Sequence, residues 1–133
     1  MTDPISDMLI RIKNAQLVHA ERVLVPASKI KQSIATILQK AGYVANVEHR
    51  TRKMKKSEQD YLDLGLQYTD GVGAISGLKI VSKPSRHLYI KAKDIKLVRS
   101  GHGMAVLSTP QGVMTSQEAR KQGIGGEVLF EIW

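Results

Sequence analysis

The chain has 133 residues, of which 42% are hydrophobic and 24% charged, so it is long enough to bury a core of its own. Its formal charge of +8 favours a polyanionic partner, nucleic acid first, over a surface that is basic only for solubility. The lack of cysteine excludes disulfides and thiolate metal sites, and no apolar run reaches the roughly 20 residues that span a bilayer.

The chain is expected to open with a helix, because Asp3 can cap it and Pro4 suits its first position. This N-terminus has neither the basic start nor the apolar centre of a signal peptide, so we expect a soluble protein that is not exported. The apolar face of the helix is predicted at helical spacing, from Ile5, Met8, Leu9, Ile12 and Ala15.

A short strand is predicted at residues 22–25, followed by a second helix that Ser28 caps and Gly42 ends. Its apolar face is expected to carry Ile30, Ile34, Ile37, Leu38 and Ala41. Lys29 and Lys31 lie in its first turn, where the helix dipole disfavours cations. This placement is a hint that the two lysines face an anion.

Residues 43–49 alternate in polarity and predict a strand, and residues 60–68 predict its neighbour. Between them lies a strongly basic run, which is either a flexible hairpin tip, solvated and without a ligand, or an arm that follows phosphates. Its five cations are Arg50, Arg52, Lys53, Lys55 and Lys56.

The second half predicts short strands at residues 74–82, 87–90, 104–107 and 128–133, with a helical turn at residues 94–98. Thr115 and Glu118 form a capping box for one short helix, which Gly123 can end. The fold class is therefore α+β. Residues 1–70 form an α-β-α-β-β lobe, packed beside a β-rich lobe of residues 71–133.

Ser108 and Thr109 start a turn-forming cluster that runs to Gly112, and their hydroxyls can donate and accept hydrogen bonds. Two interpretations stay open: a loop that reads polar edges or sugar hydroxyls, and a hairpin that satisfies only itself. The histidines are scattered without metal-ligand spacing, and paired carboxylates are not evident. We therefore expect no enzyme, no metal and no cofactor.

Four segments carry a specific likeness, in order and spacing: residues 3–14, 28–31, 84–89 and 103–127. The last contains Gly103-Met-Ala-Val-Leu-Ser-Thr-Pro-Gln-Gly-Val-Met-Thr115, then Glu118-Ala-Arg120 and Gly125-Gly-Glu127. Together they resemble the family of small-subunit ribosomal protein eight, over residues 2–133.

The resemblance implies a structural constituent of the small ribosomal subunit that binds the central domain of its ribosomal RNA and helps assembly. Neighbouring small-subunit ribosomal proteins are implied partners, in the cytoplasm, with an organelle ribosome left open. The alternatives are a repressor that binds its own operon message, and a small RNA-processing enzyme that uses Ser108 or His102. A membrane partner is not expected.

The resemblance also implies the contact residues. Ser108 and Thr109 would touch bases and sugars on the minor-groove side, and Tyr89 would stack or support. Proline and glutamine at positions 110 and 111 depart from the family's serine and basic residue, so Thr109 should supply more of the contact. The remaining expected RNA-binding residues are Gln111, Gly112, Arg86, Asp3, Pro4, Lys29 and Lys31. The five cations of the basic run are expected contacts from their charge, because this run is longer and more basic than in many members of the family.

Overall fold

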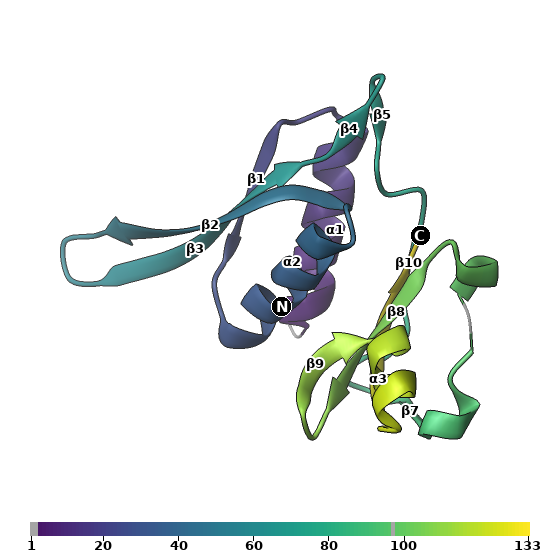
Figure 1. Ribbon diagram of the computed structural model, residues 1–133. Helices are drawn as coiled ribbons and strands as arrows, with labels where there is room; N and C mark the ends of the chain where they lie inside the picture. The colour runs from purple at the N-terminus through teal and green to yellow at the C-terminus, as the bar shows by residue number, and fades with distance from the viewer. Residues whose placement is uncertain (1–2, 97) are drawn as a thin grey trace. The chain divides into compact units, whose positions relative to one another are not determined.

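The structure is a computed structural model that describes residues 3–96 and 98–133 (Figure 1). It divides into two compact units, Asp3–Ala74 and Ile75–Trp133, where the sequence predicted a boundary between residues 70 and 71. The described residues hold three α-helices and antiparallel sheets, which confirms the α+β class.

The first unit forms a three-stranded antiparallel sheet in the order β1-β3-β2 with two helices. Its elements are α1 (Pro4–Leu17), β1 (Arg22–Pro26), α2 (Lys29–Lys40), β2 (Val44–Lys53) and β3 (Glu58–Leu66). The predicted order of elements is therefore found. The predicted third strand is wrong at its end, because Tyr68–Thr69 (β4) leaves the sheet and forms a small hairpin with Val72–Gly73 (β5). Asp70 and Gly71 make its turn with positive φ angles.

The core of the first unit lies between the helices and the sheet. The caps follow the sequence, since Asp3 and Ser28 accept hydrogen bonds from the backbone of the first turns of α1 and α2. Each large apolar side chain removed from water contributes roughly 1.5–3 kcal/mol. The largest fully buried ones are Met8, Leu9, Ile12, Val25, Ile34, Leu38, Val44, Leu62 and Leu64.

A bulge in β2 changes which of its residues face the core. The register with β3 shifts between Val44 and Asn46, so the simple alternation expected for residues 43–49 is interrupted. As a result Val44 is buried and Ala45 is exposed.

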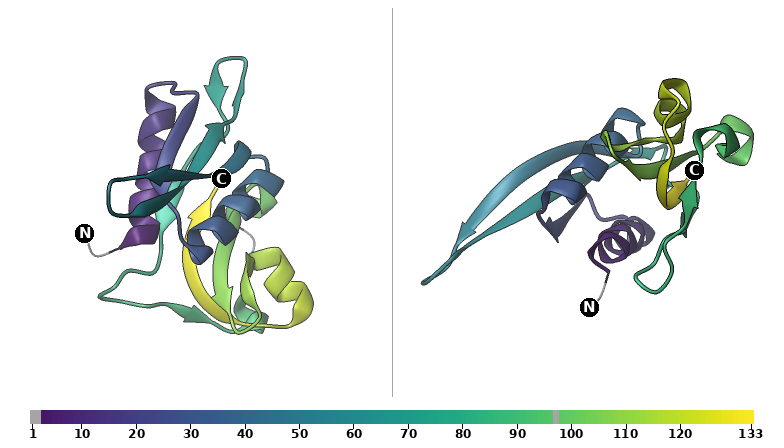
Figure 2. Two further views of the ribbon diagram at one scale, coloured as in Figure 1. Left: turned by 90° about the vertical axis from the view of Figure 1, so that its left-hand side faces the viewer. Right: turned by 90° about the horizontal axis from the view of Figure 1, so that it is seen from below.

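The strands β2 and β3 continue as a two-stranded ribbon. The third strand, β1, pairs only with residues Tyr61 to Gly65 of β3, whereas β2 pairs with β3 as far as Lys53 and Glu58. Figure 2 shows this ribbon running on beyond the helices of the same unit. We call the segment from Arg50 to Asp60 the arm.

The second unit contains a five-stranded antiparallel sheet with the path β6-β10-β8-β9, and β7 also pairs with β10. Its elements are β6 (Leu78–Ile80), β7 (Tyr89–Ile90), β8 (Met104–Thr109), β9 (Gly112–Thr115), α3 (Ser116–Gln122) and β10 (Gly126–Ile132). Thr115 caps α3 and Gly123 ends it with a φ of 71°, as the sequence predicted.

Two predictions for this unit are wrong. The strand expected at residues 74–82 is confined to Leu78–Ile80, because the N–H groups of Ser76 and Gly77 both reach the Trp133 carbonyl instead of a regular ladder. The helical turn expected at residues 94–98 is replaced by two 3-10 turns, Ala92–Asp94 and Val98–Gly101. Residue 97 of that prediction lies outside the described residues.

Candidate nucleic-acid interface

The predicted hydroxyl loop is a tight hairpin turn. Ser108 and Thr109 belong to β8 and pair with Val113 and Gly112 of β9, so only Pro110 and Gln111 remain between the strands. The ring of Pro110 presets its φ for a turn, and Gly112 takes a φ of 111° that other residues rarely adopt. The turn is therefore shorter and stiffer than a loop of five residues.

The two adjacent hydroxyls have different surroundings. Thr109 Oγ1 donates to the Gly112 carbonyl at 2.7 Å and accepts from the Gln111 N–H at 3.1 Å, which closes the turn. The Ser108 hydroxyl has no hydrogen-bond partner among the described residues and is half-buried. The hairpin thus satisfies Thr109 itself and leaves Ser108 available to a ligand.

The register of the sheet places Ser108 in a row of side chains that crosses four strands. Glu127 of β10 lies opposite Ser108 of β8 on one side and opposite Tyr89 of β7 on the other, while Val113 of β9 follows Ser108. Directly opposed residues in antiparallel strands carry their side chains on the same face. An exposed aromatic ring, a carboxylate and a hydroxyl therefore lie side by side, and we call Tyr89, Glu127 and Ser108 the reading row.

Two glycines permit this row. A Cβ on Gly126 would lie 2.4 Å from the carbonyl oxygen of Ser108, and a Cβ on Gly125 would lie 2.4 Å from that of Ile90. Any larger residue would push the start of β10 out from between β7 and β8. The sequence pattern alone does not reveal this close approach of the backbones.

His87 and Glu127 were also missed as members of the site. His87 Nδ1 lies 2.6 Å from Glu127 Oε2, and the imidazole is 53% exposed. Arg86 beside it is exposed, and its main chain closes a turn through two 2.9 Å hydrogen bonds with Lys83. The Gly125-Gly-Glu127 part of the resemblance was the available signal, but spacing alone does not show which strands it joins.

The expected contact residues of the first unit are only partly available. The Asp3 carboxylate accepts from the Ser6 N–H at 3.2 Å and from the Ser6 hydroxyl, while Pro4 and Lys29 are exposed. Lys31 is buried, 6% exposed, and its ammonium group donates to the Pro26 carbonyl at 3.2 Å. The structure therefore uses Lys31 to tie α2 to the end of β1.

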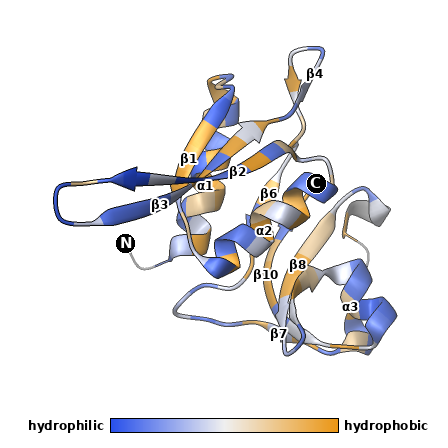
Figure 3. Ribbon diagram, turned by 60° about the vertical axis from the view of Figure 1, so that its left-hand side comes forward, coloured by the Kyte–Doolittle hydropathy of each residue, from blue (hydrophilic) through white to orange (hydrophobic). Residues whose placement is uncertain are grey.

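The five cations of the arm also differ. Arg50 is paired with Asp63 at 2.8 Å and with Glu48 at 2.7 Å, and the Arg52 guanidinium lies 6.0 Å from the centre of the Tyr61 ring. Figure 3 shows the outer part of the arm as strongly hydrophilic. The other three cations of the arm are Lys53, Lys55 and Lys56. Their ammonium groups are exposed and have no ion-pair partner among the described residues.

A buried carboxylate anchors the root of the arm. The side chain of Asp63 is 8% exposed and accepts from Arg22 Nε at 2.7 Å and from Arg50 Nε at 2.8 Å. Burial acts to raise the pKa of Asp63, but the hydrogen bonds and charges of the two arginines outweigh it, so the pKa lies below 3.8. The carboxylate thus stays ionised between two guanidinium groups.

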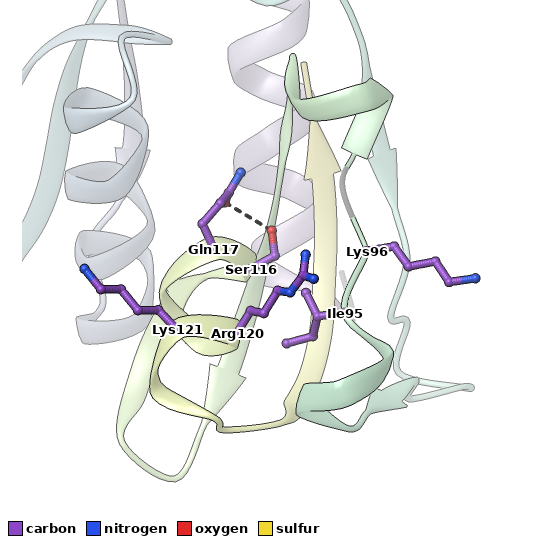
Figure 4. Close-up of a pocket in the computed structure, with 6 residues that line it drawn as sticks. All are labelled: Ile95, Lys96, Ser116, Gln117, Arg120 and Lys121. Atoms are coloured by element: carbon purple, nitrogen blue, oxygen red, sulfur yellow. Dashed lines mark hydrogen bonds between the residues drawn. The ribbon is translucent and has the colours of Figure 1, made fainter.

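A pocket of about 400 Å³ lies between α3 and the segment around Ile95 in the second unit (Figure 4). The Arg120 side chain reaches toward Ile95, whereas Lys96 and Lys121 point away, and Ser116 donates to the Gln117 side chain at 3.2 Å. The cations that line the pocket therefore do not converge on one point.

Two other kinds of feature are absent from residues 3–96 and 98–133. No cluster of acids and histidines there could hold a metal ion, and no helix is long and apolar enough to cross a membrane.

The comparisons with known proteins agree on one family. The family model described as Ribosomal protein S8 matches residues 3–133. The chain is 45% identical to the small ribosomal subunit protein uS8 of Geobacillus kaustophilus, over 100% of this chain and 98% of the relative. It is 47% identical to that of Persephonella marina and 46% identical to that of Nitratidesulfovibrio vulgaris, each over 100% of this chain and 99% of the relative. With matches along the full length of both chains, this protein belongs to the ribosomal protein S8 family.

Proposed function

We propose that the protein is a structural component of the small ribosomal subunit in the cytoplasm and binds the central domain of its ribosomal RNA. The relatives are named as small-subunit proteins, which supports the assignment to that subunit. The proposal gives the protein a binding role and assigns it no catalytic step. A messenger RNA that presented the same stem would meet the same residues.

The observation that carries the RNA-binding part is the reading row. Proteins that recognise RNA by sequence target unpaired bases, which they stack on aromatic side chains and hydrogen-bond at their edges. Tyr89 is 74% exposed and can stack a base, and the free Ser108 hydroxyl beside Glu127 can bond a base or a ribose. This set of groups matches an irregular stem better than a regular duplex.

The arm supplies the second, less specific part of the contact. Lys53, Lys55 and Lys56 are exposed on a ribbon that only two strands form, and such cations attract phosphates whatever the base sequence. Lys29 adds an exposed ammonium group at the start of α2. We leave Lys31 out of the proposed surface, since its ammonium group faces Pro26.

The experiment is a chemical footprint of the purified protein on complete small-subunit ribosomal RNA. We expect protection to concentrate in one irregular stem of the central domain, including its unpaired bases. A double variant, Ser108→Ala with Tyr89→Ala, serves as the control, and it should lose that protection. Protection spread evenly over the RNA, or found only outside the central domain, would contradict the proposal.

A further inference from the structure

Glu127 is a carboxylate at the centre of a surface that should meet a polyanion. Its side chain is 19% exposed and lies between Tyr89 and Ser108 in the reading row. One oxygen, Oε2, is 2.6 Å from His87 Nδ1, and Oε1 has no hydrogen-bond partner among the described residues. A negative charge there repels phosphates, so its position calls for a compensating interaction with the RNA.

The geometry of this carboxylate is set before any ligand binds. The backbone of β10 is held between β7 and β8, where Gly126 permits contact with the Ser108 carbonyl. The side chain is then fixed at its tip by His87. Groups whose geometry is set in advance lose little freedom on binding and so contribute more to affinity.

The chemistry of the partner follows from the acceptor character of the carboxylate. An ionised glutamate only accepts hydrogen bonds, and so does a phosphate. The donors that RNA offers are the amino and imino groups of bases and the ribose hydroxyls, and only unpaired bases present the full Watson–Crick edge. The ring of Tyr89, in the neighbouring strand, can hold such a base by stacking.

We infer that Glu127 reads the amino or imino edge of an unpaired base stacked on Tyr89, and that His87 is the residue that positions the carboxylate. This inference rests on the proposed RNA-binding function and adds a specificity determinant to it. It assigns the carboxylate a favourable contact with the RNA, although its charge alone would weaken binding to every RNA.

The first test compares Glu127→Gln with Glu131→Gln, which removes the same charge farther along β10, opposite Lys79 and Ala105. Each protein is titrated with a central-domain RNA fragment and with a fully paired stem of equal length. For Glu127→Gln we expect about tenfold weaker binding to the fragment, the loss of one good hydrogen bond to a charged group, with equal or tighter binding to the paired stem. For Glu131→Gln we expect similar small changes on both RNAs.

The sign of the change in affinity of Glu127→Gln for the fragment decides whether the inference holds. Tighter binding of both RNAs to Glu127→Gln would mean that the carboxylate is only a tolerated acid, and the inference would be wrong. If the unmodified protein itself showed no preference for the fragment, the proposed function would fail and the inference with it. A melting curve for each variant shows that the fold is retained.

Two further variants separate reach and positioning from charge. Glu127→Asp keeps the charge but withdraws the carboxylate by one methylene, so it should also lose affinity for the fragment and spare the paired stem. His87→Ala should weaken binding of the fragment less than Glu127→Asp does, because the carboxylate remains present but loses the contact with His87 that positions it. Fragment affinities of Glu127→Asp equal to those of the unmodified protein would overturn the inference.

RNA substitutions then identify the donor. Each unpaired base of the fragment is replaced in turn by an analogue without its amino group (inosine for guanine, purine for adenine) or with its imino nitrogen methylated, and each unpaired nucleotide by its 2′-deoxy form. We expect the loss of one amino or imino donor to weaken RNA binding by the unmodified protein and to leave binding by Glu127→Gln unaffected. If that loss of sensitivity appeared only in the 2′-deoxy series, Glu127 would bind a ribose and the reading of a base would be refuted.

Discussion

The adjacent hydroxyls of Ser108 and Thr109 show how one strand can divide two roles between neighbouring residues. Successive side chains of a strand point to opposite faces, so Ser108 shares a face with Glu127 while Thr109 turns toward Gly112. One hydroxyl closes the turn and the other stays available. The two positions therefore predict different consequences for stability and for RNA binding.

Replacing Ser108 with alanine should affect binding and spare the fold. Its hydroxyl has no partner among the described residues, so we expect the free energy of unfolding to change by less than about 0.5 kcal/mol. The loss of a hydrogen bond to RNA should cost about 1 kcal/mol, or roughly fivefold to tenfold in affinity for the cognate fragment. Paired titrations with the fragment and a fully paired stem, with a urea melt, measure both effects, and an equal loss on both RNAs would refute a reading role.

Replacing Thr109 with valine should do the opposite. The change removes the donor to the Gly112 carbonyl and the acceptor for the Gln111 N–H, and each such bond contributes about 0.5–1.5 kcal/mol. We therefore expect a destabilised second unit and a smaller loss of fragment affinity than for Ser108→Ala. Calorimetry reports the first effect; an unchanged melting temperature combined with a large, fragment-specific loss of affinity would make Thr109 a direct ligand.

At the scale of elements, the root of the arm depends on one ion-pair network around the buried Asp63 carboxylate. Asp63 on β3 holds Arg22 of β1 and Arg50 of β2, so the carboxylate joins all three strands where the ribbon leaves the sheet. The Arg52 guanidinium, farther out, lies 6.0 Å from the centre of the Tyr61 ring. The network therefore marks the border between the sheet that the helices cover and the ribbon beyond it.

Asp63→Asn should destabilise the protein at neutral pH by about 1.5–3 kcal/mol, the range for hydrogen bonds to charged groups. The folded protein holds the pKa of Asp63 below 3.8, so its contribution is complete above pH 3.8 and is lost as pH falls through the lowered value. The stability difference between the two proteins should therefore shrink on acidification. Urea melts at neutral pH and at several points below pH 3.8 test this, with exposed Asp70→Asn as the control. A pH-independent difference would point to packing rather than charge.

At the scale of the whole molecule, the +8 charge predicts a steep fall of RNA affinity with salt. Each neutralised phosphate contributes about 0.7–0.9 to the slope of log K against log salt. Changing Lys53, Lys55 and Lys56 to Gln should make that slope shallower by about 2 for cognate and paired RNA alike. The matched control changes Lys13, Lys40 and Lys121 to Gln, three exposed lysines that are not part of the arm segment. Equal slopes for the two triple variants would exclude the arm as the phosphate contact.

Local signals predicted the helix ends well, because a cap involves residues three apart. Asp3, Ser28, Thr115 and Gly123 all act where the sequence placed them. The reading row could not be derived in this way, since it joins residues 19 and 38 positions apart through strand register. The same holds for the arm, where Arg50 forms an ion pair with Asp63, which is distant in sequence. It also holds for Lys31, whose burial depends on the end of β1.

The short reach of β1 has a consequence for how the free protein can be cut. Beyond Tyr61 the arm is a two-stranded ribbon without a third strand, and such a ribbon is only marginally stable in water. Its tip at Met54 to Ser57 therefore opens locally far more often than the sheet behind it. Because trypsin cleaves after lysine and arginine, the first nick should follow one of residues 52, 53, 55 and 56, and bound RNA should protect those bonds. Limited proteolysis of the arm therefore reports whether RNA is bound to the protein, without a chemical label.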